Sequence, residues 1–586
     1  MSIERLLAAY REGSADPGEV VARAYERARS ASEPAWISLV AWGDVEAMLA
    51  RLREGPADLP LYGIPFAIKD NIDLAGTPTT AGCPAFAYVP EESAFAVSRL
   101  IAAGAIPIGK TNMDQFATGL TGTRTPHGSC ASVADPRYVS GGSSSGSAVV
   151  VADGTVPFAL ATDTAGSGRV PAAFNAIVGM KASLGAIGTR GVVAACRSLD
   201  CVSLLTTGVA DAARVLGVAA GVDPLDPYSR ALPATAPGAP AAGMPARIAI
   251  PRPEQTTFCG DELAAGAWRH ALARGQELGW KLVEIDFEPF AEVARLLYDG
   301  PWVAERYAAF GAFVAEHPGE VDPIVRRVIM TAREYSAVDA FAASHRLAEL
   351  RLATRTAWEQ ADALLLPTVP TIFTAAEIAE QPIARNAQLG TYTNFVNLLD
   401  LCAIAVPGGA RADGLPFGVS LIAPAGADRA LLSLAASWSG ERPIDVAGAD
   451  CVVLAVVGAH LSGEPLNHQL TGLGARLVET IDTAPGYRLY ALPGSEPAKP
   501  GLVGGGAERD GPGIELELWE LSTAAFGRLV AAVPAPLTIG TVALADGRAV
   551  KGFLCEAAAV AGAQDITAFG GWRAYRASLG DVAPVG

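Results

Sequence analysis

Hydrophobic and polar positions along the chain follow two patterns, one helical and one strand-like. In the first 13 residues, MSIERLLAAYREG, the side chains of Ile3, Leu6 and Tyr10 fall on one face of a helix. A second helix is predicted to begin after Asp16, because Asp16-Pro17 offers an N-cap side chain and a proline for the first turn. After residue 60, short apolar runs alternate with helical stretches, and these runs read IPFAI, AIPI, PFALAT, RIAIP, ALLLP and AIAVP. This alternation predicts an α/β fold in which helices cover a sheet.

The pattern changes within residues 439–450, SGERPIDVAGAD, and we place a domain boundary there. The prediction is a first domain over residues 1–443 and a smaller α+β domain over residues 450–586. The stretch 235–247 is rich in Pro, Ala and Gly, and we interpret it as a surface loop inside the first domain.

The second domain has the signals of strands. Ile514, Leu516 and Leu518 alternate with acidic residues, which is typical of a strand that buries one face. Asp546-Gly547 has the composition of a hairpin turn and stands before the apolar run AVKGFLCE. These features predict antiparallel pairing in this part of the chain.

Composition and charge narrow the possible partners and the compartment. Of the 586 residues, 50% are hydrophobic and 18% are charged, as in a folded chain. The net charge is −17 without a long Lys/Arg run, so we expect neither nucleic acid nor an anionic membrane as a partner. The eight cysteines form no CxxC pair, which predicts reduced, mostly buried thiols in the cytoplasm and no zinc site. The N-terminus lacks the apolar segment of a signal peptide, so we expect neither export nor membrane insertion.

Two short patterns match known motifs in the wrong context. Residues 104–111 fit GxxxxGK[ST], but the residues between the glycines are AIPI, which contain a proline and resemble a strand. Residues 142–146 fit GxSxG, whose serine normally follows a buried apolar strand, whereas DPRYVSG precedes it here. We therefore reject a phosphate-binding loop and a Ser-His-Asp triad.

Two Gly/Ser-rich loops and an upstream lysine carry the more specific signal. Residues 141–148 read GGSSSGSA, residues 162–169 read TDTAGSGR, and Lys69 lies in PFAIKDN. Each of them alone is typical of a flexible turn. Together with AGAIPIGKTNMDQFATG, GMKAS and GLPFGVSLIAP, they make residues 20–435 resemble the amidase signature family. The resemblance implies an α/β fold with a mixed central β-sheet covered by helices.

The catalytic triad of that family maps onto Lys69, Ser143 and Ser167, and the two serines are 24 residues apart. A serine hydroxyl needs a base within hydrogen-bond reach, and a lysine is a base only when it is uncharged. Lowering a lysine pKa from about 10.4 to about 7 costs about 4 to 5 kcal/mol, which burial beside the run IPFAI would supply. In the family, Ser143 relays the proton and its peptide bond to Gly142 is cis.

The resemblance assigns the oxyanion hole to the backbone amides of Thr164, Ala165, Gly166 and Ser167. Ser145 and Ala165 stand where the family often has glycine, but neither change removes a triad side chain. The implied reaction forms an acyl-enzyme on Ser167, releases ammonia and ends with hydrolysis by water. It requires no metal or organic cofactor.

Tyr298 and Arg306 are candidates for substrate binding. They are eight residues apart, so a helix through this segment would place both near one face. An ordinary amphipathic helix with a solvated arginine explains the same spacing. However, the chain resembles a branch of the family that acts on allophanate, urea-1-carboxylate. The resemblance lies in this segment, in NFVNLLDLCAIAVPGG and in the extra C-terminal domain. That resemblance implies that Tyr298 and Arg306 hold the substrate carboxylate, with further contacts from Gly122 and Arg124 in LTGTRTP.

The C-terminal domain carries His460 and His468, eight residues apart and without a third residue at a metal-type spacing. Structural histidines at the end of a strand fit the same residues. The resemblance implies instead that the domain decarboxylates the first product, with His460 as its functional residue. Because that product also loses carbon dioxide unaided, a role in assembly alone stays open.

The expected function is hydrolysis of allophanate, a small anionic amide, to ammonia and carbon dioxide. The reaction follows urea carboxylation, so urea carboxylase is the expected functional partner, and the expected oligomer is a homodimer. One alternative is another amidase of the family, acting on malonamide, biuret or aryl amides. A second is the A subunit of a tRNA-dependent amidotransferase, against which the acidic charge and the additional C-terminal domain argue.

Overall fold

The computed structural model describes residues 2–232, 246–298, 300–442, 451–473, 475–494, 496–504 and 513–579. These residues divide into two units, residues 2–232 with 246–442, and residues 451–579. Most of the stretch 235–247, interpreted from the sequence as a surface loop, lies outside the described residues.

One mixed sheet of eleven strands, counted over the described residues, organises the first unit. Its order is β1-β3-β2-β4-β6-β5-β10-β11-β9-β7-β8. The neighbours β3–β2, β2–β4, β9–β7 and β7–β8 are parallel, and the other neighbours are antiparallel. The strands are β1 (Trp36–Leu39), β2 (Pro65–Lys69), β3 (Ile106–Thr111), β4 (Phe158–Asp163), β5 (Val178–Lys181), β6 (Cys201–Thr206), β7 (Arg247–Pro251), β8 (Lys281–Ile285), β9 (Ala363–Pro367), β10 (Leu401–Ala410) and β11 (Pro416–Pro424). The predicted α/β fold with a mixed central sheet is confirmed.

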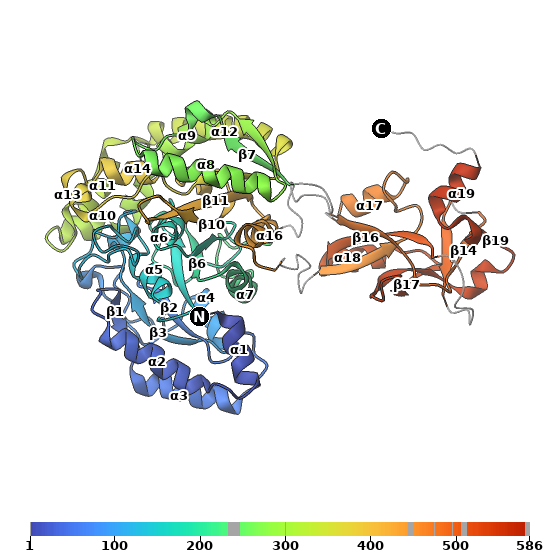
Figure 1. Cartoon of the computed structure of the whole chain (residues 1–586), viewed down its shortest axis with the longest axis horizontal. Helices are drawn as coiled ribbons and strands as arrows, with labels where there is room; N and C mark the ends of the chain where they lie inside the picture. The colour runs from blue at the N-terminus through green and yellow to red at the C-terminus, as the bar shows by residue number, and fades with distance from the viewer. Residues whose placement is uncertain are drawn as a thin grey trace. The chain divides into compact units, whose positions relative to one another are not determined.

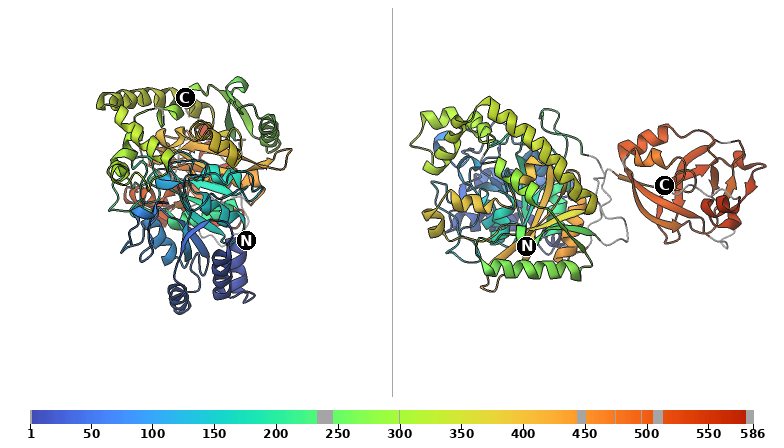
Figure 2. Two further views of the ribbon diagram at one scale, coloured as in Figure 1. Left: turned by 90° about the vertical axis from the view of Figure 1, so that its left-hand side faces the viewer. Right: turned by 90° about the horizontal axis from the view of Figure 1, so that it is seen from above.

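Helices surround this sheet, as Figures 1 and 2 show, with α1–α3 at one end of the unit and α9 and α12 at the other. The helix α2 begins at Pro17 as predicted, because the Asp16 side chain accepts a hydrogen bond from the Glu19 amide at 3.1 Å. The helices are α1 (Ile3–Arg11), α2 (Pro17–Ser30), α3 (Trp42–Glu54), α4 (Phe95–Ala102), α5 (Ser145–Ala152), α6 (Arg169–Phe174), α7 (Val209–Ala219), α8 (Glu262–Glu277), α9 (Glu288–Leu296), α10 (Val303–Glu316), α11 (Pro323–Met330), α12 (Ala337–Gln360), α13 (Ala375–Glu380), α14 (Ala384–Leu389), α15 (Phe395–Leu398) and α16 (Asp428–Ser439).

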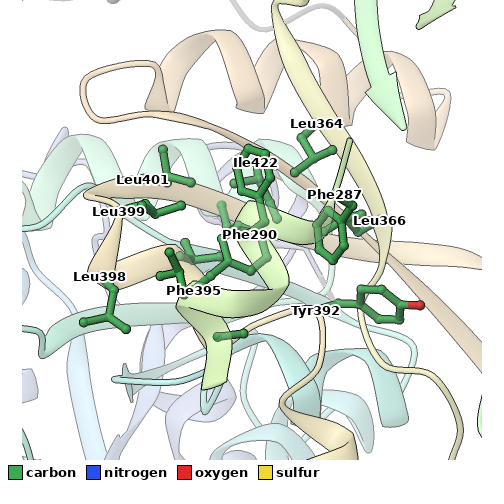
Figure 3. Packing of buried hydrophobic residues seen from close by; sticks show 14 of the residues in the cluster. Phe287, Phe290, Leu364, Leu366, Tyr392, Phe395, Leu398, Leu399, Leu401 and Ile422 are labelled. Carbon is green, nitrogen blue, oxygen red and sulfur yellow. The ribbon is translucent and has the colours of Figure 1, made fainter. Parts of the chain in front are cut away.

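The apolar runs seen in the sequence form the buried centre of the sheet. Residues 65–68 of the run IPFAI lie in β2, whose residues are all buried and whose parallel neighbours are β3 and β4. The run AIPI lies in β3, which agrees with its rejection as a phosphate-binding loop. Figure 3 shows a hydrophobic cluster in which Phe290 of α9 and Phe395 of α15 pack near Leu364 of β9 and Ile422 of β11. The same cluster includes Ala165, so the core extends to the loop after β4.

The second unit has a five-stranded sheet of order β13-β16-β12-β18-β17 and a three-stranded sheet of order β15-β14-β19, within the described residues. Ile514, Leu516 and Leu518 are buried as predicted, but Glu517 between them is also buried, because it pairs with Arg573 at 2.6 Å. The turn at Asp546-Gly547 joins two antiparallel strands, β17 and β18. The elements are β12 (Cys451–Val456), α17 (Asn467–Thr471), β13 (Arg476–Asp482), β14 (Arg488–Ala491), β15 (Pro500–Val503), β16 (Glu515–Ser522), α18 (Thr523–Ala531), β17 (Leu537–Ala543), β18 (Ala549–Cys555), β19 (Gln564–Asp565) and α19 (Trp572–Ser578).

Most cysteines are buried, as predicted, in the part of the chain that the structure describes. Seven are free thiols, six of them buried and Cys259 exposed. Among the described residues, no group of His, Cys, Asp and Glu side chains is arranged to hold a metal ion. Within the same residues, no helix combines the length and the apolar character that crossing a bilayer requires.

Candidate active site

Lys69 is the last residue of β2 and is fully buried. Its Nζ atom donates hydrogen bonds to Ser143 Oγ and to Thr162 Oγ1, each at 2.8 Å. Burial lowers the pKa of Lys69 to about 7, although Asp114, Asp200 and Asp163 act in the opposite direction. A large fraction of the protein therefore carries an uncharged amine at neutral pH, held by two hydroxyl groups.

Ser143 lies in the loop just before α5, and its peptide bond to Gly142 is cis. The loops around it are held by Asp114, which accepts hydrogen bonds from the amides of Gly122 at 3.0 Å and Arg124 at 2.8 Å. The Asp114 amide in turn donates to the Ser143 carbonyl at 3.2 Å. A Cβ atom on Gly142 would lie 2.2 Å from Asp114 Oδ2, so only glycine fits at this position. The serine hydroxyl is thus fixed against the lysine by its own loop.

Ser167 lies between the end of β4 and the start of α6 and is 2% exposed. The Asp163 carboxylate shapes this loop. It accepts the amides of Gly166 at 2.7 Å and Gly168 at 3.1 Å, and it forms a two-pronged ion pair with Arg169, with both N–O distances 2.9 Å. Burial opposes the charge of Asp163, but Arg169 outweighs it and keeps the pKa of Asp163 lowered.

The loop at residues 164–167, called here the oxyanion loop, has three backbone amides without a hydrogen-bond partner among the described residues, those of Thr164, Ala165 and Ser167. The Gly166 amide is already used by Asp163, so its prediction as an oxyanion donor is corrected. Gly166 instead allows the backbone conformation of the loop, since its φ is +131° and a Cβ atom at this position would lie 2.4 Å from Thr393 Oγ1.

The structure brings only part of the predicted triad into hydrogen-bond contact. Lys69 and Ser143 are joined directly, whereas the Ser167 hydroxyl makes no hydrogen bond within the described residues. The transfer of a proton from Ser167 to Ser143 is therefore part of the proposed mechanism rather than an observed contact. Sequence reasoning missed Thr162, the second acceptor for Lys69, and Asn71, which donates to Thr162 Oγ1 at 3.2 Å. Both stand in the quoted motifs TDTAGSGR and PFAIKDN, which is the one signal that pointed to them.

Arg306 of α10 is a fully buried guanidinium beside the ring of Tyr298. Its NH2 group donates to the Tyr298 hydroxyl at 3.3 Å, and its NH1 group contacts Cys196 Sγ at 3.7 Å. Its Nε atom has no partner, and no carboxylate of the described residues hydrogen-bonds to the guanidinium, although the charges of Asp200 and Glu305 act on it from a distance. A buried cation without a counter-ion is costly, and a carboxylate on a ligand would compensate it.

The helical geometry expected for Tyr298 and Arg306 is wrong. The helix α9 ends at Leu296 and α10 begins at Val303, so the two residues do not share a helix. Gly300-Pro301 explains the break, because neither residue supports a helix interior. The two side chains nevertheless meet, because the Arg306 guanidinium contacts the ring and the hydroxyl of Tyr298.

Gly122 and Arg124 both form hydrogen bonds that hold the loops of the site together. The Gly122 amide is bound to Asp114. The Arg124 guanidinium donates to the carbonyls of Thr118 at 2.9 Å and Pro382 at 2.8 Å. Substrate contacts of these two residues stay a prediction, and the structure adds a role in holding the loops.

In the second unit, His460 lies at the wall of a cavity of about 280 Å³. Its ring stacks on Phe553 with centroids 5.0 Å apart, and its Nε2 atom shares a hydrogen bond with Gln469 Oε1 at 3.0 Å. Burial lowers the pKa of His460, so its neutral form is favoured. Lys499 also lines the cavity, which makes this wall partly polar. His468, by contrast, is exposed.

Comparison with known families and proteins gives matches over both units. A family model described as amidase matches residues 19–432, and one described as allophanate hydrolase C-terminal domain matches residues 452–577. Urea amidolyase of Saccharomyces cerevisiae is 42% identical over 573 residues, which cover 92% of this chain and 31% of that protein. The chain thus spans about a third of the curated urea amidolyases it matches.

Solved structures and a further relative extend the comparison. Selenomethionine-substituted Kluyveromyces lactis allophanate hydrolase superposes with a TM-score of 0.78 at 40% identity, over 99% of both chains. The glutamyl-tRNA(Gln) amidotransferase A subunit from Symbiobacterium thermophilum is 36% identical over 429 residues, 67% of this chain and 85% of that protein. The amidotransferase match thus leaves a third of this chain uncovered.

The buried amine of Lys69 makes a testable contribution to stability. Its pKa is about 7 in the folded chain and about 10.5 when exposed, so between these values the unfolded state binds a proton that the folded state lacks. Stability from this group therefore rises with pH, by up to about 1.4 kcal/mol per pH unit. The free energy of unfolding, measured by urea denaturation, should rise with pH for the parent relative to Lys69→Met across this window. A difference that stays constant with pH would contradict the lowered pKa.

Proposed function

Because the chain belongs to the amidase family, as its match over residues 19–432 establishes, we propose that it hydrolyses allophanate to ammonia and carbon dioxide. The observation that carries the proposal is the buried Arg306 guanidinium, which lies beside Tyr298 and hydrogen-bonds to no carboxylate of the described residues. Allophanate presents one carboxylate for this cation and one amide for the serine. The likeness to Kluyveromyces lactis allophanate hydrolase over both units supports the assignment.

In the proposed mechanism Ser167 is the nucleophile. Uncharged Lys69 accepts the proton of Ser143, and Ser143 accepts that of Ser167 as its oxygen attacks the amide carbon. The negative oxygen of the tetrahedral intermediate takes hydrogen bonds from the free amides of the oxyanion loop. Lys69 then returns the proton through Ser143 to the departing nitrogen, so ammonia leaves and an ester remains on Ser167. Water, activated by the same pair, hydrolyses the ester and releases N-carboxycarbamate.

The carboxylate of the substrate is held by Arg306 and Tyr298. The planar guanidinium binds a carboxylate through two parallel hydrogen bonds, and its unpartnered Nε atom is one available donor. The Tyr298 ring covers the cation, and its hydroxyl is oriented by the same guanidinium. A neutral amide leaves this cation buried and uncompensated, so the site favours a carboxylated substrate.

Substitution of Arg306 tests this assignment. For Arg306→Ala, kcat/KM on allophanate should fall by about 10²-fold or more, because a buried ion pair is lost. The rate on neutral malonamide should change by about threefold at most, since it lacks the carboxylate. Arg306→Lys keeps the charge without the planar fork, so its kcat/KM on allophanate should lie between those of the parent and the alanine variant. The measurement is ammonia release at steady state.

The same assay separates the rival functions. The parent protein is compared on allophanate, malonamide, biuret and glutamine. Preference for biuret or malonamide would assign the chain to another amidase activity, and preference for glutamine would favour an amidotransferase subunit. Unchanged allophanate turnover in Arg306→Ala would remove the carboxylate assignment and leave the triad untouched.

For the second unit we propose that His460 promotes decarboxylation of N-carboxycarbamate. The cavity beside it fits a small molecule, and its lining carries one cationic and one anionic side chain, Lys499 and Glu496. The match of residues 452–577 to the allophanate hydrolase C-terminal domain supports a role in the same reaction. The competing proposal is that the unit serves assembly and that the product decarboxylates unaided.

Carbon dioxide release distinguishes these roles. In His460→Ala, carbon dioxide should appear later than the first ammonia, whereas in the parent both rise together. His468→Ala is the matched control, because this exposed histidine lies eight residues away and outside the cavity lining. Simultaneous release in both variants would assign the unit to assembly. Ammonia and carbon dioxide are followed in one reaction by continuous assays.

We further propose that the chain acts after a urea carboxylase in the cytoplasm. The name urea amidolyase belongs to relatives that are about three times as long, and it supports coupling to a step that carboxylates urea. The free thiols of the described residues support a reducing compartment.

We propose that the chain is a homodimer that meets through α12. Val338, Phe341 and Leu352 on this helix are 76%, 68% and 65% exposed, while Leu347 and Leu350 on the other side are buried. Val338 and Leu352 lie seven residues to either side of His345. Two antiparallel copies of α12 would therefore bring Val338 of each against Leu352 of the other, which closes a twofold contact.

Light scattering tests the dimer. The parent should have twice the mass of the 60.1 kDa chain, and Phe341→Glu should shift the mass toward the single chain. Leu225→Glu is the matched control, because Leu225 is 74% exposed and lies outside α12. A single-chain mass for the parent would overturn the dimer. If both variants keep the mass of a dimer, the contact between the two copies does not lie at α12.

A further inference from the structure

Asp200 is a buried carboxylate that lies next to the oxyanion loop and outside the predicted triad. It directly precedes β6, whose residue Cys201 pairs with Asp163 at the end of β4. Its Oδ1 atom accepts a hydrogen bond from the Thr164 hydroxyl. Its Oδ2 atom accepts the amides of Ala195 at 2.6 Å and Cys196 at 3.1 Å. Both oxygens are thus used within the protein.

The hydrogen bonds of the two carboxylate oxygens of Asp200 connect it to the two functional parts of the site. On one side, Thr164 carries one of the free amides of the oxyanion loop. On the other side, the segment at residues 195–196 contacts Arg306 through Cys196 Sγ. One residue, Thr164, therefore connects Asp200 to the proposed oxyanion donors, and one residue, Cys196, connects it to the proposed carboxylate-binding cation.

Asn397 of α15 also holds the backbone on both sides of the contact between Asp200 and Thr164. Its Nδ2 atom lies 2.7 Å from the carbonyl of Asp163, 3.0 Å from that of Thr164 and 2.8 Å from that of Leu199. The carbonyl and the side chain of Thr164 are thus both fixed, the first by Asn397 and the second by Asp200. With these two groups fixed, the direction in which the oxyanion loop presents its amides is also fixed.

We propose that Asp200 is a positioning residue, which couples the carboxylate-binding site at Arg306 to the alignment of the oxyanion loop through the Thr164 hydroxyl. This inference rests on the proposed function, because the coupling acts on a carboxylated substrate. Asp200 touches no reacting atom. Its effect appears when the intermediate forms, since misplaced amides weaken the binding of the transition state more than that of the substrate.

The test compares Thr164→Val with Thr164→Ser. Valine has the shape of threonine without the hydroxyl, whereas serine keeps the hydrogen-bond donor. For Thr164→Val, kcat on allophanate should fall by about 10²-fold while KM changes by about threefold at most. For Thr164→Ser, kcat should stay within about threefold of the parent. Equal kcat in the two variants would overturn the positioning role, because then the hydroxyl does not matter.

A double-mutant cycle with Arg306→Ala tests the coupling. The kcat/KM loss of the double variant on allophanate should be smaller than the product of the two single losses by about tenfold or more. Losses that multiply would show that the two sites act independently and would overturn the coupling. Asp200→Asn gives a second route if Thr164→Val does not fold, and the same fall in kcat is expected from it, while a parental kcat would contradict the proposal.

Failure of the proposed function has a different signature. In that case the parent protein releases no ammonia from allophanate but hydrolyses another amide. The valine and serine variants are then compared on that amide, where a fall in kcat confined to valine supports positioning and equal rates contradict it. If that amide carries no carboxylate, Arg306→Ala should change its rate by about threefold at most, so the comparison there tests the positioning role and not the coupling.

Discussion

The site depends on a lysine that is buried among hydroxyl groups instead of carboxylates. Lys69 reaches this position because β2 is buried along its whole length and runs parallel to β4, which brings Thr162 next to the amine. Two hydroxyl acceptors satisfy the amine without favouring its charged form as strongly as a paired carboxylate would. Burial lowers the pKa of Lys69 to about 7, and the same amine is close enough to Ser143 to act as its base.

The buried acids of the first unit organise the backbone of the loops, and their charges also act on Lys69 and Arg306 from a distance. Asp114 fixes the loop around Ser143, Asp163 fixes the loop around Ser167, and Asp200 joins that loop to the segment beside Arg306. Burial raises the pKa of Asp114 and Asp200, and Arg169 keeps the pKa of Asp163 lowered. None of these three acids forms a hydrogen bond with Arg306, and we propose that the carboxylate of the substrate does.

The sequence predicts the strands and the motif residues well, since both are local signals. The run IPFAI and the Asp16 cap depend on neighbours within a few positions, and both are found as predicted. Long-range partners are different: Asp200 is 36 residues from Thr164, and Asn397 is 198 residues from Leu199, so spacing says nothing about their contacts. The expected helix through Tyr298 and Arg306 is wrong because Gly300-Pro301 interrupts it. Glu517 is buried although the alternation of its strand predicts exposure, because Arg573, far along the chain, pairs with it.

The most direct test of an uncharged Lys69 is the pH dependence of kcat/KM for ammonia release by the parent protein. Only the amine form is a base, so kcat/KM should rise about tenfold per pH unit on the acid side and level off above the pKa of about 7. A profile that stays flat through neutral pH, or that begins to rise only near the pKa of an exposed lysine at about 10, would contradict the account.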